Sequence, residues 1–193
     1  MFNILKYILG FFLLVTVFTM CNSIKKSLDN KDLSYLNKTI DSMYNLDQKI
    51  RYSSIELDSI YGVDFKSNGK FLFHNEKKLK LGEKFVSYEN KQDSIVKVRD
   101  KIDLSNTKKL IQLTKRYGFP SKNRLKAKKA CSYLIFVHSP REYREEIKQL
   151  ISEEYKMQRI SEYEKAYIDW HLQGRNGAPP RLGKNNRVIY NTN

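Results

Sequence analysis

Residues 34–50 read SYLNKTIDSMYNLDQKI, and the spacing of the apolar positions in this run sets the class of fold. Four apolar side chains recur three, four or seven residues apart: Leu36, Ile40, Met43 and Ile50. Positions spaced in this way share one face of an α-helix. The run is therefore predicted to lie within a long helix over residues 25–61, and Gly62 is predicted to end that helix.

The pattern changes after this helix. Two short apolar clusters, Phe71-Leu72-Phe73 and Phe85-Val86, are separated by lysines. Asn68-Gly69 between the helix and these clusters is a turn signal. Residues 63–99 are therefore predicted to form a small hairpin or an irregular insertion.

Helical signals are again clear near residue 103. Asp103, Ser105 and Asn106 are residue types that cap helix N-termini, so a second helix is predicted to begin here. Gly118 and Pro120 are predicted to end it.

Three further helices are predicted beyond Pro120. Residues 125–138 contain the apolar run CSYLIFV, in which a buried helix and a buried strand have the same pattern; the length favours a helix. The run Ser139-Pro140-Arg141-Glu142 is predicted to begin the next helix with a capping box. The inner faces of the last two helices are predicted to consist of Tyr143, Ile147, Leu150, Ile151 and Tyr155, and of Ile160, Tyr163, Tyr167 and Trp170.

These elements predict a mainly α fold of about five helices in one compact domain. The chain has 193 residues, which is enough for one hydrophobic core. The predicted domain covers residues 21–173, with the insertion at about residues 63–99. The basic tail, residues 174–193, is rich in glycine, proline and asparagine and is predicted to be loop or partly disordered.

Composition excludes several classes of protein. With 40% apolar and 30% charged residues, the chain is neither a multi-span membrane protein nor a low-complexity chain. Two cysteines exclude a disulfide-stapled scaffold and a four-cysteine zinc site. Cys131 lies in an apolar run and is predicted to be a small buried hydrophobe. Phosphate-loop, dinucleotide and metalloprotease motifs are absent from the sequence, so neither a cofactor nor a metal is expected.

The N-terminus is predicted to direct export. Residues 7–20 carry no charge and are too few to span a bilayer, which needs about 20 apolar residues, but they fit the core of a signal peptide. Cys21 follows at once, which resembles a bacterial lipoprotein signal with Cys21 as the lipid-modified residue. Phe18 and Met20 differ from the residues usual in that signal. Two alternatives stay open: an uncleaved anchor over residues 7–24, and cleavage by the ordinary signal peptidase.

Five short motifs of this chain, in their order, resemble the motifs of a family of uncharacterised bacterial proteins, a domain of unknown function. The family pattern is D-Q-x-x-R, D-x-x-N, G-[WF]-P, H-[AS] and a late D-R. The corresponding residues are Asp47-Gln48-Lys49-Ile50-Arg51, Asp103-Leu104-Ser105-Asn106, Gly118-Phe119-Pro120, His138-Ser139 and Asp169-Trp170. Trp170 stands where the family has arginine, so the last motif matches in part. The resemblance implies a fold and candidate residues over about residues 30–183, and no activity.

The candidate site residues are polar side chains at otherwise apolar helix positions. Asp47 falls on the apolar stripe of the first helix, and a buried carboxylate requires a partner such as Arg51 one turn on. His138 ends the most apolar run of the chain. Asp47, His138 and Asp169 are predicted to form a carboxylate–imidazole cluster, with His138 as a general base. The candidate binding residues are Gln48, Arg51, His171 and Arg175. A satisfied structural anchor is the alternative for both Asp47 and His138.

The charge distribution points to a partner. The formal net charge is +15, and the 38 residues between Asp103 and Glu142 contain no acidic residue. For an exported protein this charge favours anionic lipid or an acidic envelope polymer and makes nucleic acid unlikely. We therefore expect a membrane-associated domain of the cell envelope that binds an envelope component. The alternatives are a hydrolase that uses His138 with Asp47 or Asp169, and a purely structural envelope protein.

Overall fold

The structure is a computed structural model of the chain. It describes residues 27–65, 71–73, 81–127, 131–183 and 187–189. Within these ranges it contains six α-helices, one short 3-10 helix and two two-stranded antiparallel β-ladders, which confirms the mainly helical prediction.

The apolar N-terminal run and Cys21, for which a signal or an anchor is predicted, lie outside the described residues. Of the helices that the structure does describe, none combines the length and the apolar character needed to span a bilayer.

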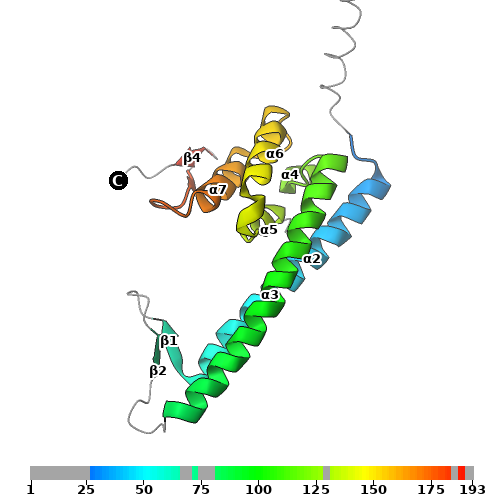
Figure 1. The fold of residues 1–193 in the computed structure, drawn as a ribbon. Coiled ribbons are helices and arrows are strands. Elements are labelled where there is room, and N and C mark those ends of the chain that lie inside the picture. Colours follow the sequence, from blue (N-terminus) through cyan, green and yellow to red (C-terminus); the bar gives the residue numbers. More distant parts are fainter. Residues whose placement is uncertain (1–26, 66–70, 74–80, 128–130, 184–186, 190–193) are drawn as a thin grey trace, which may run out of the picture.

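Two long helices, α2 (Asn30–Tyr61) and α3 (Leu81–Tyr117), run antiparallel and give the molecule its elongated shape (Figure 1). The start of α2 lies five residues later than predicted because Asp29 caps it, with its carboxylate accepting a hydrogen bond from the Asp32 amide at 2.7 Å. Gly62 ends α2 as predicted. Its φ of 64° is a left-handed conformation that glycine adopts without strain.

The prediction that a helix begins near Asp103 is wrong, because α3 begins at Leu81. Asp103, Ser105 and Asn106 therefore lie inside the helix, and residues 81–99 are helical rather than part of an irregular insertion. The side chain of Asn106 does not cap; it donates a hydrogen bond to the Met43 carbonyl of α2 at 3.1 Å. A polar residue of this type is stable inside a helix when its amide bonds to a neighbouring element.

The predicted hairpin is present at the far end of the α2–α3 pair (Figure 1). Strands β1 (Val63–Phe65) and β2 (Phe71–Phe73) pair antiparallel, with Val63 opposite Phe73. A small apolar cluster of Leu57, Val63 and Tyr88 lies beside it. This cluster is separate from the main core.

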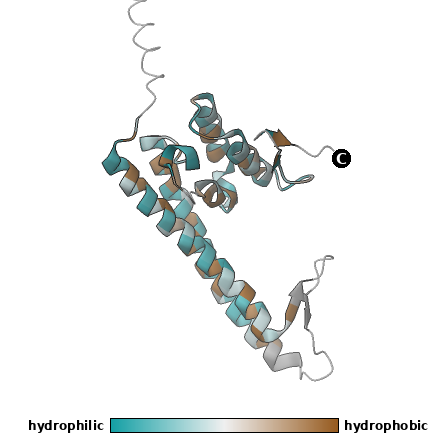
Figure 2. Cartoon of the chain, turned by 180° about the vertical axis from the view of Figure 1, so that it is seen from behind, coloured by the Kyte–Doolittle hydropathy of each residue, from teal (hydrophilic) through white to brown (hydrophobic). Residues whose placement is uncertain are grey.

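The remaining helices pack where α2 begins and α3 ends, and the main core lies at that junction (Figures 1 and 2). These elements are α4 (Lys122–Leu125), α5 (Ser132–Val137), η1 (Arg141–Tyr143), α6 (Arg144–Lys156) and α7 (Glu162–Leu172). The fully buried apolar side chains of this core are Leu36, Ile40, Leu110, Phe119, Ile135, Phe136, Ile147, Ile151 and Ile168. Tyr155 was predicted on the inner face of α6 but is 43% exposed.

The single helix predicted over residues 125–138 is two short helices. Lys126 ends α4 in a left-handed conformation with φ of 52°, and α5 begins only at Ser132. The apolar run forms α5 as a helix rather than a strand, as its length predicted.

The capping box predicted at Ser139 is wrong. Pro140 is extended, with φ −58° and ψ 151°, and the chain first forms η1, so α6 begins at Arg144. The buried Oγ of Ser139 has no hydrogen-bond partner among the described residues. A capping box does exist at the start of α7, between Ser161 and Glu164. In the tail, β3 (Arg181–Leu182) pairs with β4 (Val188–Ile189).

Candidate functional site

Five polar residues meet where α2, α3 and α5 come together, and we call them the Asp47 cluster. Asp47 is only 1% exposed and lies on the apolar stripe of α2, as predicted. Gln48 and Arg51 belong to the same helix, Asp103 comes from α3, and His138 directly follows α5.

Every acceptor oxygen of Asp47 is in use. Its Oδ1 accepts a hydrogen bond from Arg51 Nη2 at 3.0 Å and lies 2.9 Å from His138 Nδ1, while Oδ2 accepts from Gln48 Nε2 at 2.8 Å. Burial by itself would raise the pKa of Asp47. The hydrogen bond and charge of His138, together with the Arg51 guanidinium, outweigh burial and hold this pKa below its ordinary value of 3.8. Asp47 is therefore ionised at neutral pH.

Arg51 connects the two carboxylates of the cluster. Its Nη2 also donates to Asp103 Oδ1 at 2.7 Å, so α2 and α3 are joined across 52 residues of sequence. For Asp103, burial outweighs the attraction of Arg51, and its pKa is raised. The guanidinium occupies the space between Asp47 and Asp103 in which a metal ion would have to sit. Within the described ranges, no group of three or more histidine, cysteine, aspartate or glutamate residues is arranged to hold a metal.

The contacts of His138 assign its neutral tautomer. Arg51 Nε lies 3.2 Å from Nδ1 and Asp47 Oδ1 lies 2.9 Å from the same atom. One ring nitrogen cannot accept from Arg51 and donate to Asp47 at once. Because ionised Asp47 only accepts, the shorter contact requires a proton on Nδ1. The lone pair is then on Nε2, to which no described residue donates a hydrogen bond, so Nε2 is the atom available to take up a proton.

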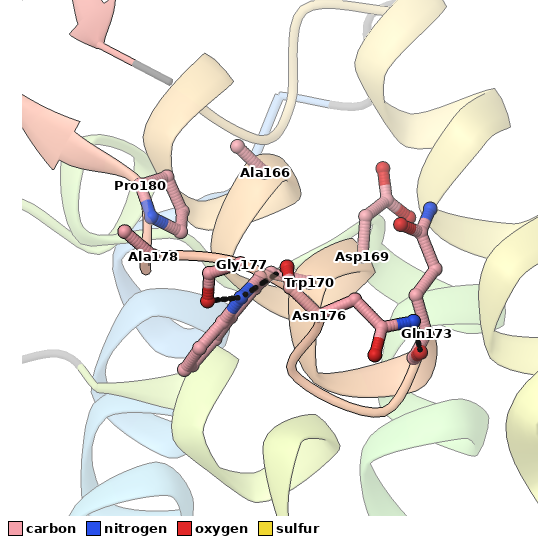
Figure 3. A pocket seen from close by; sticks show the side chains of 8 residues that line it. All are labelled: Ala166, Asp169, Trp170, Gln173, Asn176, Gly177, Ala178 and Pro180. Atoms are coloured by element: carbon pink, nitrogen blue, oxygen red, sulfur yellow. Dashed lines mark hydrogen bonds between the residues drawn. The ribbon is translucent and has the colours of Figure 1, made fainter. Parts of the chain in front are cut away.

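Asp169 was predicted to join Asp47 and His138, but the structure pairs it with Lys165, at 2.5 Å between Oδ2 and Nζ. It lies instead on the wall of a cavity of about 350 Å³ between α7 and the loop that follows, which we call the α7 cavity (Figure 3). Among the described residues, Asp169 forms no hydrogen bond or ion pair with Asp47 or His138.

His171 and Arg175, two of the candidate binding residues, contact each other. Arg175 Nε donates to His171 Nδ1 at 3.2 Å. Burial, then the charge of Arg175 and then that of His138, lower the pKa of His171 to about 4. His171 is thus neutral at physiological pH. It lies close enough to His138 for a charge on that ring to lower the pKa of His171.

A second buried polar group was missed in the sequence. Glu154 of α6 is 3% exposed and accepts from Arg159 Nε at 2.7 Å, from Arg159 Nη2 at 2.6 Å and from the Phe119 amide at 2.7 Å. Arg124 completes the group by donating to the carbonyls of Phe119 and Tyr117. Glu154 follows Leu150 and Ile151 at helical spacing, so the argument that identified Asp47 would have identified it too.

Cys131 differs from its prediction in burial. It is half-buried rather than buried, and it forms no disulfide. Burial raises the pKa of its thiol, which disfavours the reactive thiolate.

Comparisons with protein-family models, with curated proteins and with solved structures find no match for this chain. The resemblance to a domain of unknown function therefore stays a prediction.

Proposed function

We propose that the chain is an exported, membrane-associated domain that binds a phosphate-bearing anion of the cell envelope. The proposed anchor is the apolar N-terminal run, as a lipoprotein signal ending at Cys21 or as an uncleaved anchor. The proposed binding surface is a row of exposed cations on α3: Lys101, Lys108, Lys109 and Lys115. We call this row the α3 lysine stripe.

The observation that carries this proposal is that most of the stripe has no acidic partner among the described residues. Lys101, Lys108 and Lys115 recur every seven residues, which places them on one face of α3, and Lys109 lies beside Lys108 at the edge of that face. Three of the four form no ion pair with a described residue. Lys115 pairs with Glu146 at 2.6 Å, and both side chains are largely exposed. Cations left unpaired in this way attract anionic surfaces, each contributing about 1 kcal/mol close to an anionic membrane.

The position of the stripe supports the proposal. Because α2 and α3 are antiparallel, the start of α2 and the end of α3 lie at the same end of the pair (Figure 1). The N-terminal run precedes α2, so an anchor there would hold the stripe near the membrane to which the run is attached. Phosphate groups of lipids and of envelope polymers would then both be within reach.

The test is to weaken the stripe without disturbing the fold. The full chain, held in nanodiscs of neutral phosphatidylcholine, is titrated with a soluble glycerol-phosphate polymer, and hydrogen exchange of α3 is compared in nanodiscs that contain phosphatidylglycerol. Lys108→Gln with Lys109→Gln is expected to weaken binding about thirtyfold, since two cations contribute about 2 kcal/mol.

The matched control is Lys49→Gln with Lys156→Gln, which removes the same charge from two exposed lysines outside the stripe, one on α2 and one on α6. Binding to the polymer but not to anionic nanodiscs would assign a polymer as the ligand, and the reverse would assign lipid. Equal losses in both double variants, or binding unaffected by added salt, would contradict the proposal.

A second candidate, a hydrolase-type enzyme, is supported by the 2.9 Å contact that orients His138 through Asp47 and leaves Nε2 free. If Nε2 acts as a general base, His138→Gln is expected to lower turnover of p-nitrophenyl ester or phosphodiester substrates by about a hundredfold. Gln149→Ala, at an exposed position of α6, is the control. Wild-type protein that does not exceed the background hydrolysis of either substrate would rule this candidate out for both bond types.

A further inference from the structure

The α7 cavity has the features of a built ligand site. Its floor is one face of α7, formed by Ala166, Asp169, Trp170 and Gln173, which are spaced three or four residues apart. The loop after α7 folds back over this face. Its volume of about 350 Å³ falls within the ordinary range for ligand cavities, about 300–1,000 Å³, and near its lower end.

Hydrogen bonds from Trp170 hold the loop in place. The indole Nε1 donates to the carbonyls of Asn176 and Gly177, at 3.1 Å and 3.2 Å (Figure 3). The chain turns through left-handed residues at Gly174, Arg175 and Gly177, and Pro180 closes the loop as a buried residue. The cavity therefore exists before any ligand arrives, which reduces the entropy lost on binding.

The walls of the cavity divide into an apolar side and a polar side. Figure 3 shows Trp170, Ala178 and Pro180 on one side, and Asp169 and Gln173 on the other. Asp169 Oδ2 accepts a hydrogen bond from Lys165, and Asp169 Oδ1 has no partner among the described residues. The side-chain amide of Gln173 and the Oδ1 of Asn176 likewise have no described partner.

This arrangement selects the chemistry of the ligand. Lys165 neutralises the charge of Asp169, so the cavity attracts neither a cation nor an anion strongly. Gln173 and Asn176 are exposed, so water occupies their hydrogen-bonding groups when the cavity is empty, and the hydroxyl groups of a ligand can take the place of that water. A compact neutral molecule with hydroxyl groups on one side and C–H groups on the other would satisfy both walls.

We infer that the α7 cavity binds a neutral sugar, with its hydroxyl groups on Asp169, Gln173 and Asn176 and its C–H surface against Trp170. This inference is independent of the α3 lysine stripe. It assigns a second ligand of different chemistry, one or two sugar rings in size, to a site built by α7 rather than α3.

Trp170 makes the test direct, because it is the only tryptophan of the chain and its fluorescence reports on this cavity alone. The full chain in neutral detergent is titrated with glucose, galactose, mannose and N-acetylglucosamine. At least one is expected to give a saturable change in Trp170 fluorescence with a dissociation constant of about 1 mM for a single ring. The change should not depend on salt.

Asp169→Asn is expected to weaken this binding about tenfold, because a hydrogen bond to a charged acceptor is lost. Gln112→Ala on the exposed surface of α3 is the control for Gln173→Ala: the second should weaken binding and the first should leave it unchanged. Circular dichroism verifies that each variant is folded. No saturable change with any of the four sugars, or equal affinity in Asp169→Asn and wild type, would overturn the inference.

Discussion

Asp47→Asn is expected to lower the free energy of unfolding by about 2–4 kcal/mol, because it removes a buried charge that three side chains share. Arg51 and His138 would both lose their buried acceptor, and the asparagine amide would direct a donor or a neutral oxygen at them. Arg51 keeps its contact with Asp103, which limits the loss. Urea unfolding followed by circular dichroism measures the change.

The control is Asp41→Asn, the same substitution at an exposed position of α2. It should change the free energy of unfolding by less than about 0.5 kcal/mol, as exposed substitutions usually do. An effect of Asp47→Asn as small as this would show that the Asp47 cluster does not hold α2, α3 and α5 together.

The stabilisation by Asp47 should also depend on pH, with a sign that follows from its pKa. Folding lowers the pKa of Asp47 below its ordinary value of 3.8, so the unfolded chain takes up the proton more readily than the folded one. The contribution is therefore fully present above about pH 5 and is lost as the pH falls through the folded pKa. Asp103 has the opposite shift. The charge of Asp47 is one cause of that raised pKa, so the wild-type-minus-variant difference in unfolding free energy includes this coupling as well as Asp47 itself; it should still shrink in acid, where Asp47 is protonated.

Glu154→Gln is expected to have the largest effect on stability, about 3–5 kcal/mol, since it breaks a buried ion pair by removing one partner. The side chains of Glu154 and Arg159 are only 4% and 15% exposed, and Arg159 binds both oxygens of the carboxylate. Without the negative charge, the guanidinium stays buried near Arg124 with no ionised partner. The Phe119 amide would also lose its charged acceptor.

The neighbouring residue supplies the control. Glu153→Gln makes the same chemical change on the same helix at an exposed position. In thermal melts, Glu154→Gln should lower the midpoint by about 6–20 °C, at roughly 2–4 °C for each kcal/mol in a domain of this size, while Glu153→Gln should lower it by about 1–2 °C. Comparable shifts in the two variants would mean that the group at Glu154 is solvated rather than buried.

The sequence predicted α2 well and α3 poorly, and packing explains the difference. One face of α2 meets the main core, so its apolar residues recur regularly. The outer half of α3 packs against α2 and, through Tyr88, against Val63 of β1, and for that a narrow seam suffices. Tyr88 and Ile95 supply the apolar part of this seam, and Gln92 bonds to Ser54 at 2.6 Å. In a helix held by so few apolar contacts, apolar residues do not recur regularly at helical spacing. The sequence of this half therefore predicts an irregular insertion instead of a helix.

The same reasoning applies to capping residues. Ser139-Pro140-Arg141-Glu142 has the pattern of a capping box, yet the chain forms a 3-10 turn there. Asp103 has the residue type of an N-cap, yet it is the partner of Arg51. Local pattern alone cannot distinguish a side chain that caps its own helix from one that bonds to another element, because both roles use the same short polar groups.

The sequence by itself determined the features that depend on residues close along the chain. These are the helical class, the end of α2 at Gly62, and the need of Asp47 for a partner at an otherwise apolar position. Only the tertiary structure decided which groups meet. His138 reaches Asp47 across 91 residues and Glu154 reaches the Phe119 amide across 35, while Asp169 pairs within its own helix and lines the α7 cavity. The physical reason is that helical periodicity is fixed by local backbone geometry, whereas the pairing of buried charges is fixed by how the helices pack.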